Sequence, residues 1–180
     1  AVRCWGDDSS GKATPLTGAY LAVGTGRDHS CAITDDGDGA GSLVCWGDNT
    51  HGQIDPPAGS FTQLGAGNYH TCAVSDAGAA ECWGWDMFGQ STPPVLPSGG
   101  VWLSVAADSL HSCGITMDAI GYEDMACWGE NTFNQTDAYT FAGAWSGLEM
   151  SVGTTHSCVL VLGRIYCGGN NLQEQLPAAY

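Results

Sequence analysis

Residues 45–53 read Cys-Trp-Gly-Asp-Asn-Thr-His-Gly-Gln, and altered copies of this phrase return along the whole chain. The copies begin at Cys4, Cys82, Cys127 and Cys167, and each runs into a polar turn that ends in an amide or a Lys. A second phrase, His-[Ser/Thr]-Cys, precedes all but the first copy and begins at His29, His70, His111 and His156. These starts lie 41, 41 and 45 residues apart, a spacing typical of a repeat protein.

Each repeat has the pattern of short β-strands joined by tight turns. In residues 158–167 two apolar runs flank the two-residue turn Leu-Gly, which places Cys158 opposite Cys167 in a hairpin. A three-residue loop, residues 76–78, places Cys72 opposite Cys82 in the same way. In the longer hairpins of the first and third repeats the two cysteines are also expected to lie opposite each other. The sequence therefore predicts four hairpin disulfides, which join Cys31 to Cys45, Cys72 to Cys82, Cys113 to Cys127 and Cys158 to Cys167.

A metal–thiolate site is the alternative use of these cysteines. It is disfavoured because the cysteines are spread one pair to a repeat, without the clustered Cys-x-x-Cys spacing of zinc sites. Nine cysteines in 180 residues instead indicate an oxidising compartment. We predict a secreted, extracellular or cell-surface protein. The chain begins at Ala1, and we interpret it as a mature form from which a leader was removed.

The combination of Trp-Gly, an Asn turn, Gly-Gln and an upstream Gly-x-x-His resembles the regulator-of-chromosome-condensation repeat. That resemblance implies a β-propeller that acts as a protein-binding platform. The secreted bacterial relatives that inhibit β-lactamases are more similar in character than the chromatin-binding prototype, because this chain is strongly acidic. The family usually has seven blades, whereas this chain has about four and a half units.

We predict an all-β fold, a small or open β-propeller of about four to five blades with one disulfide in each hairpin. The whole chain, 1–180, is expected to form a single repeat domain. Its predicted parts are a half-unit at 1–17 and repeats at 18–58, 59–99, 100–142 and 143–180. The half-unit carries Cys4-Trp5-Gly6 and is expected to supply the third strand of a blade.

The charge balance limits the classes of partner. Nineteen acids against four Lys and Arg give a net charge of −15, which disfavours nucleic acid and anionic lipid surfaces. No apolar run is long enough to span a bilayer, so membrane insertion is not expected. No Gly-x-Ser-x-Gly, phosphate loop or His-Glu-x-x-His motif is present, and we predict that the protein is not an enzyme.

Features that differ between repeats carry the functional hypotheses. Trp85, Met87 and Phe88 stand where other repeats have polar turn residues, and Phe133 lies in the third repeat. Aromatic side chains and Met on variable loops are typical of binding faces, so these four are the binding-face candidates. The repeated Trp5, Trp46, Trp83 and Trp128 are instead expected to pack between blades.

Two groups of residues could bind a metal ion, the four repeated histidines and an acidic loop, and each has a structural role as the alternative. The four repeated histidines could form a ring for a transition metal, but a residue found in every unit is usually architectural. We expect each one to hydrogen-bond the turn of its own blade. The loop with Asp35, Asp36 and Asp38 has the density of acids and Gly of a calcium loop but lacks the terminal Glu of an EF-hand. We therefore predict no cofactor, with calcium at this loop as the alternative to a solvated hairpin tip.

Cys4 remains after four pairs are formed, so it is predicted to be unpaired or to form an intermolecular disulfide. Our first functional hypothesis is a secreted, non-enzymatic protein-binding scaffold. The second is a homo-oligomer or polymer, an extracellular filament or ring joined through the half-unit. An inhibitor of a secreted enzyme and a carbohydrate-binding lectin are further alternatives.

Overall fold

The computed structural model describes residues 1–137 and 146–171, and these contain four three-stranded antiparallel sheets. The first blade holds β1 (Tyr20–Thr25), β2 (His29–Thr34) and β3 (Leu43–Gly47), and the second holds β4 (Phe61–Ala66), β5 (His70–Ser75) and β6 (Ala80–Gly84). The third holds β7 (Val101–Ala107), β8 (His111–Met117) and β9 (Glu123–Gly129), and the fourth holds β10 (Glu149–Gly153), β11 (His156–Val161) and β12 (Arg164–Gly169). Each sheet lies within one of the repeats expected from the sequence.

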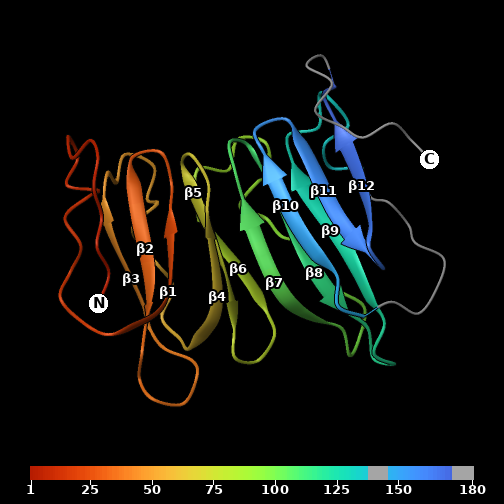
Figure 1. Cartoon of the computed structure of the whole chain (residues 1–180), viewed down its shortest axis with the longest axis horizontal. Coiled ribbons are helices and arrows are strands. Elements are labelled where there is room, and N and C mark those ends of the chain that lie inside the picture. Colours follow the sequence, from red (N-terminus) through yellow and green to blue (C-terminus); the bar gives the residue numbers. More distant parts are fainter. Residues whose placement is uncertain (138–145, 172–180) are drawn as a thin grey trace.

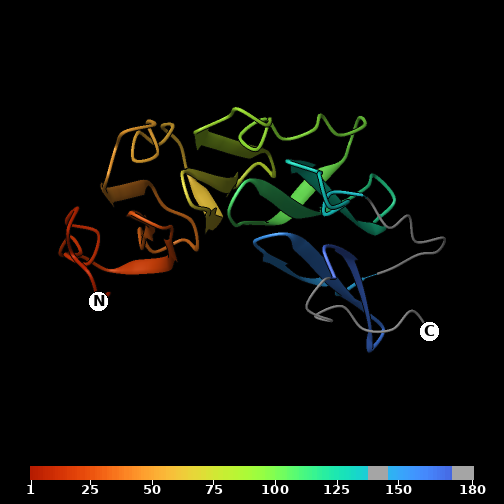
Figure 2. The same ribbon diagram turned by 90° about the horizontal axis from the view of Figure 1, so that it is seen from above.

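The four sheets stand side by side along a curve, like blades of an open propeller (Figures 1 and 2). The first strands of neighbouring blades contact one another, β1 with β4, β4 with β7, and β7 with β10. The polar turns that follow β3, β6 and β9 lie at the upper end in Figure 1, and the hairpin tips lie at the lower end. The all-β propeller-like fold expected from the sequence is confirmed.

The hairpin register explains the disulfides. In each blade the two cysteines of the central and third strands are directly opposite each other. All four predicted disulfides are formed, with Cα atoms 4.0–4.1 Å apart. In the fourth blade Leu162 and Gly163 both have positive φ, at 48° and 77°, which is the backbone of a two-residue hairpin turn. Gly78 has φ of 78° in the three-residue loop of the second blade, as expected.

The apolar core lies between blades rather than within one sheet. One cluster joins the first two blades through Ile33, Leu43, Phe61 and Ala73. A second joins the second and third blades through Cys72, Val74, Trp102, Val105 and Trp128, with the rings of Trp102 and Trp128 in edge contact at 5.2 Å. A third joins the last two blades through Cys113, Ile115, Met125, Val159 and Val161. A flat three-stranded sheet has two faces, and each blade covers one face of its neighbour.

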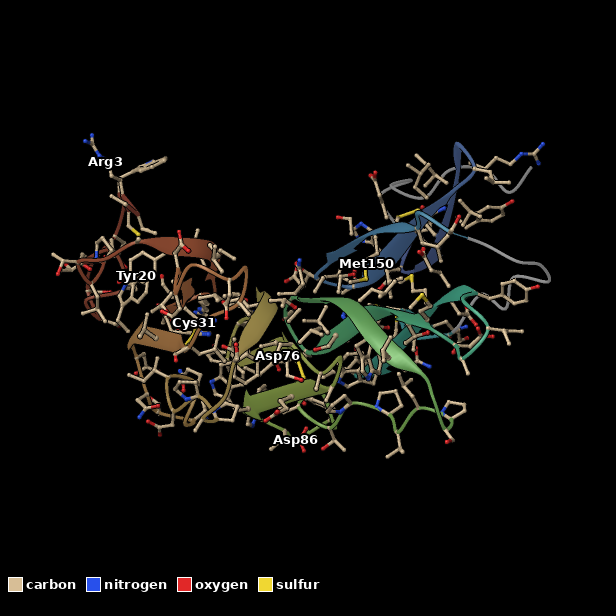
Figure 3. The ribbon with its side chains drawn as sticks, turned by 90° about the horizontal axis from the view of Figure 1, so that it is seen from below. Arg3, Tyr20, Cys31, Asp76, Asp86 and Met150 are labelled. Atoms are coloured by element: carbon tan, nitrogen blue, oxygen red, sulfur yellow. A yellow bond between two sulfur atoms is a disulfide. The ribbon has the colours of Figure 1, made fainter. Side chains whose placement is uncertain are left out.

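The N-terminal half-unit differs from the expectation. Residues 1–19 contain no strand, and Trp5 is 89% exposed instead of packed between blades. Figure 3 shows Arg3, two residues before Trp5, projecting away from the first blade. The polar turn of this unit nevertheless packs on the first blade, because Trp46 Nε1 donates to the carbonyl oxygen of Lys12. The structure describes no sheet partner for the phrase before that turn, and this explains the exposure of Trp5.

Most of the polar turn that follows the fourth Cys phrase, at Cys167, lies outside the described residues.

Candidate functional site: an aromatic cluster on a modified turn

The polar turn after the third strand of a blade has a repeated internal geometry. In the first blade the buried Gln53 accepts a hydrogen bond from the backbone N–H of His51 and donates one to Asp48 at 2.7 Å. Gln135 makes the same two bonds, to Phe133 and Glu130, in the third blade. The amide side chain thus joins the acid that opens the turn to the backbone at its centre.

The N-terminal turn keeps this arrangement with a different donor. Lys12 replaces the Gln, and its Nζ lies 2.7 Å from Asp7, the acid that opens the turn. Lys12 Nζ also donates to Asp28 in the first blade at 2.7 Å. An acid paired with a buried or half-buried donor is therefore the rule in three of the four turns that the structure describes.

The second blade breaks this rule. Gln90 is fully buried and its Oε1 accepts from Phe88 N at 2.9 Å, but Trp85 stands where the other turns have an acid. Gln90 Nε2 consequently has no hydrogen-bond partner among the described residues. The backbone of the turn is unchanged, since Trp85 N donates to Tyr69 O at 2.9 Å, as Asp48 N does to Asp28 O. An unsatisfied buried donor costs about 1–3 kcal/mol, so the turn with Trp85 lacks a hydrogen bond that stabilises the other turns.

Trp85 is the centre of an aromatic cluster, which we define as His51, Tyr69, Trp85 and Phe88. Its ring centroid lies 5.7 Å from that of His51, 5.5 Å from Tyr69 and 5.9 Å from Phe88. Tyr69 meets both Trp85 and His51 edge-on. These spacings and angles are those of favourable aromatic pairs, so the four rings hold one another in place.

Arg27 extends the aromatic cluster toward the first blade. Its Nη1 donates to the Tyr69 hydroxyl at 2.6 Å, and its Cζ lies 5.7 Å from the centre of the Tyr69 ring. The cluster therefore spans the boundary between two blades. Asp86, next to Trp85, is labelled in Figure 3 and marks this turn on the outer side of the second blade.

Of the four binding-face candidates, the structure brings Trp85 and Phe88 into ring contact and places Met87 beside them. Met87 is 72% exposed and Phe88 is 45% exposed. Phe133, 41% exposed, occupies the position of Phe88 one blade further along and belongs to a separate turn.

Sequence reasoning missed three contributors to this surface, His51, Tyr69 and Arg27. A signal for Tyr69 was present, since the residue before each repeated His is Asp28, Tyr69, Leu110 or Thr155. This position therefore varies between repeats as much as the turn that carries Trp85. No such signal showed that His51 and Arg27, from the first repeat, would meet rings of the second.

The repeated histidines lie in seams between blades. Nε2 of His29, His70 and His111 lies 2.8 Å from the hydroxyl oxygens of Thr71, Ser112 and Ser157, respectively. Each hydroxyl belongs to the next blade, so the expectation that each His would bond the turn of its own blade was wrong. Each of these histidines begins the central strand of its blade, which contacts the first strand of the next blade, so the ring reaches that neighbour more directly than its own turn.

The hydroxyl between the second and third blades fixes the tautomer of His70. Ser112 donates to the carbonyl oxygen of Gln90 at 3.1 Å, so it must accept its other hydrogen bond from His70 Nε2–H. The ring is then neutral, with an unprotonated Nδ1 that has no partner among the described residues. Burial lowers the pKa of His29, His70 and His111 from 6.5 to about 4, because a charged ring would lose its hydration.

The repeated tryptophans close the same seams. Nε1 of Trp46, Trp83 and Trp128 donates at 2.9 Å to the main-chain oxygens of Lys12, Gln53 and Gln90. Each acceptor belongs to the preceding polar turn. These three tryptophans therefore join successive units, as the sequence predicts.

Acidic loops and histidines do not gather into a metal centre in the residues described. Within 1–137 and 146–171, no group of three or more His, Cys, Asp or Glu side chains is arranged to hold a metal ion. Asp35, Asp36 and Asp38 are exposed at the first hairpin tip. Oδ1 of Asp35 and of Asp38 each accept a backbone N–H two residues ahead, which organises the tip as a pair of tight turns.

Cys4 has no disulfide partner among the described residues and is partly exposed in the segment without strands. The part of the chain that the structure describes holds no helix long and apolar enough to cross a membrane.

Comparisons with known proteins agree with this geometry. The family described as "Regulator of chromosome condensation (RCC1) repeat" matches residues 21–53, which run from the inner strand of the first blade to its buried Gln53. The chain is built of RCC1-like β-propeller repeats. No curated protein matches the chain.

Solved structures with RCC1-like propellers include plant receptor ectodomains. The ectodomain of the Physcomitrella patens receptor kinase CR4 is 27% identical, with a TM-score of 0.63 over 86% of this chain and 40% of that one. The CRINKLY WD40 ectodomain of Arabidopsis thaliana ACR4 is 26% identical, with a TM-score of 0.63 over 83% of this chain and 50% of that one.

Prp20p of Saccharomyces cerevisiae, whose binding properties to Gsp1p and histones are described, shares the fold at 16% identity. Its TM-score is 0.66 over 86% of this chain and 47% of that one. The chain thus spans half or less of the length of these three RCC1-like structures.

Proposed function

We propose that this protein is a secreted, non-enzymatic module that binds a protein partner through the aromatic cluster and Met87. The observation that carries the proposal is Trp85, which replaces the acid of a repeated turn and leaves Gln90 Nε2 unpaired. A residue that leaves a buried donor unpaired and adds aromatic side chain to the surface is typical of a binding site, because binding supplies the reason to retain it. Four disulfides support an extracellular setting, as do the receptor ectodomains with the same fold.

The composition of the cluster suits a protein partner. Tyr, Trp, Phe and Met are the side chains most enriched at the centres of protein interfaces, and the rigid rings lose little conformational entropy on binding. The cluster joins two blades, so its shape is held by the seam between them. An inhibitor of a secreted enzyme would use the same surface, and the partner search below includes that case.

The test uses the substitution that the other repeats suggest. Trp85→Asp gives the second turn the acid found at Asp48, which supplies a partner for Gln90 while it removes the central ring. The full chain and this variant are immobilised and exposed to extracellular proteins of the source organism, and bound proteins are quantified by mass spectrometry. Leu162→Ser, at a 78% exposed side chain on the fourth hairpin tip, is the matched control.

We expect at least one protein that the native chain and Leu162→Ser retain equally and that Trp85→Asp retains about tenfold less, because interface aromatics often contribute 2 kcal/mol or more. A second variant, Met87→Ser with Phe88→Ser, should show the same loss. Identical sets of bound proteins for all variants would reject the aromatic cluster as the binding surface.

A second candidate function, self-assembly, is favoured by the N-terminal segment. Trp5 is 89% exposed beside Cys4, which lacks a disulfide partner among the described residues. Native mass measured with and without reductant, and for Cys4→Ser, tests this candidate. Reductant-sensitive oligomers that Cys4→Ser abolishes would support it, and a monomer under all three conditions would reject it.

A further inference from the structure

A second surface, at the opposite end of the blades, is independent of the proposed aromatic site. It is a groove of about 500 Å³ between the tip of the β8–β9 hairpin and residues 96–100, the segment that leads into β7. In Figure 1 the hairpin tips lie at the lower end, whereas the polar turns that carry Trp85 lie at the upper end.

The groove lies where the third hairpin tip, residues 118–122, faces residues 96–100. The second and fourth hairpins close in tight loops over residues 76–78 and 162–163. The first tip is long but is used for packing, since Gly41 and Phe61 exchange backbone hydrogen bonds at 2.9 and 3.0 Å. The third tip instead contacts the preceding linker, and the space between them stays open.

Hydrogen bonds make the third tip rigid. Asp118 N donates to Tyr122 O at 2.9 Å, and Oδ1 of the same Asp accepts from the backbone N–H groups of Ile120 and Tyr122. The opposite wall approaches closely at Gly99, where an added Cβ would lie 2.9 Å from the Cβ of Ala119. The groove is therefore formed before any ligand binds.

The lining combines apolar walls with negative charge. Leu96, Met117, Ile120 and Tyr122 supply the apolar part, and Ile120 is 74% exposed. Asp118, Glu123 and Asp124 are the acidic residues of its lining, and Glu123 Oε2 also accepts a hydrogen bond from Leu148 N at 2.8 Å. None of the four Lys and Arg of the chain is among its lining residues, so the charge is not balanced from within.

We propose that this groove binds a segment of another protein that presents an Arg or Lys between apolar side chains. The carboxylates attract the cation, the Tyr122 ring offers a face for it, and Ile120 with Met117 contacts the flanking apolar groups. A purely apolar ligand would leave the acidic side chains of the lining without a counter-charge, and a purely cationic one would leave Ile120 exposed. The cation with apolar flanks is the chemistry that satisfies both parts of the lining.

The test uses short capped peptides and the full chain. The probe is acetyl-Leu-Arg-Leu-amide, and its control replaces Arg by citrulline, which has nearly the same shape without the charge. Binding is followed by NMR shifts of the Ile120 and Met117 methyl groups. We expect the citrulline peptide to bind at least about tenfold more weakly, and Ile120→Ser to weaken the Arg peptide to a similar degree.

Two controls keep the outcome clear. Val95→Ser, at a 96% exposed side chain outside the lining, should bind like the native chain. Trp85→Asp should also leave these shifts unchanged, which separates this site from the aromatic cluster. Equal binding of the two peptides, shifts confined to the aromatic cluster, or no shifts at millimolar peptide would each overturn the proposal.

Discussion

The seams between blades and the turn after β6 make opposite use of buried polar groups. At three seams a histidine Nε2 lies 2.8 Å from a hydroxyl of the next blade, and at two of them that hydroxyl donates to a main-chain carbonyl, at 3.5 and 3.1 Å. At the turn after β6, Gln90 lacks the acid that the buried Gln of the neighbouring turns binds, because Trp85 stands in its place. What recurs in every unit builds the propeller, and a departure from the repeat that leaves a buried donor unpaired points to binding.

The largest expected effect is a loss of folding stability at low pH, caused by the three buried histidines between blades. Burial holds the pKa of His29, His70 and His111 at about 4, whereas in the unfolded chain these side chains titrate near 6.5. As the pH falls from 6.5 to 4, the unfolded state takes up protons that the folded state does not, so the free energy of unfolding decreases. Each histidine contributes up to about 3 kcal/mol to this decrease.

Chemical denaturation of the disulfide-bonded protein at pH 7 and pH 4.5 measures the loss. The carboxylates of Asp7, Asp8 and Asp48, whose pKa values are lowered mainly by side-chain hydrogen bonds, lose their stabilising effect at lower pH and barely affect this window. His70→Gln should remove about a third of the pH dependence. His51→Gln, at an exposed ring of the aromatic cluster, should leave it unchanged. Equal slopes in the two variants would show that the seam histidines do not control acid stability.

A smaller effect is expected when the buried Gln is replaced in the first turn, which has the acid, and in the second turn, which lacks it. Gln53→Leu removes the donor to Asp48 and the acceptor of His51 N–H, so it should lower the free energy of unfolding by about 2–4 kcal/mol. Gln90→Leu removes the acceptor of Phe88 N–H but also the unpaired Nε2, so a loss of at most about 1 kcal/mol is expected. Urea denaturation at pH 7 measures both. Equal losses would mean that Gln90 Nε2 is satisfied as well as Gln53 Nε2, and the argument for Trp85 would fail.

The sequence predicted relations within a blade far better than relations between blades. The hairpin register follows from counting residues across tight turns, and it placed Cys158 opposite Cys167 and Cys72 opposite Cys82. The bond from His70 to Ser112 spans 42 residues and depends on how one sheet packs on the next, which no local pattern encodes.

The candidate site shows the same limit. Trp85 and Phe88 could be predicted because they depart from the repeat, whereas their contact with His51 required the arrangement of two blades. Trp5 shows the converse, since it has the repeated phrase but lacks the sheet that buries its equivalents.

The smallest expected effect on stability comes from Trp85→Asp, and it is the most decisive for the comparison. The new acid gains a hydrogen bond from Gln90, worth about 1.5–3 kcal/mol when charged, and the loss of three ring contacts offsets a similar amount. The net change in the free energy of unfolding should therefore stay within about 1 kcal/mol.

A double-mutant cycle with Gln90→Leu separates the two contributions. In the Gln90→Leu background the new acid has no amide to bind, so Trp85→Asp should destabilise the protein by about 1–2 kcal/mol more than it does in the native background. Urea denaturation of the four proteins gives this coupling energy. A coupling near zero would mean that an acid at position 85 does not bind Gln90, and that the second turn never had the pair found in its neighbours. The predicted coupling, together with loss of partner binding, would show that residue 85 exchanges a stabilising hydrogen bond for a binding surface.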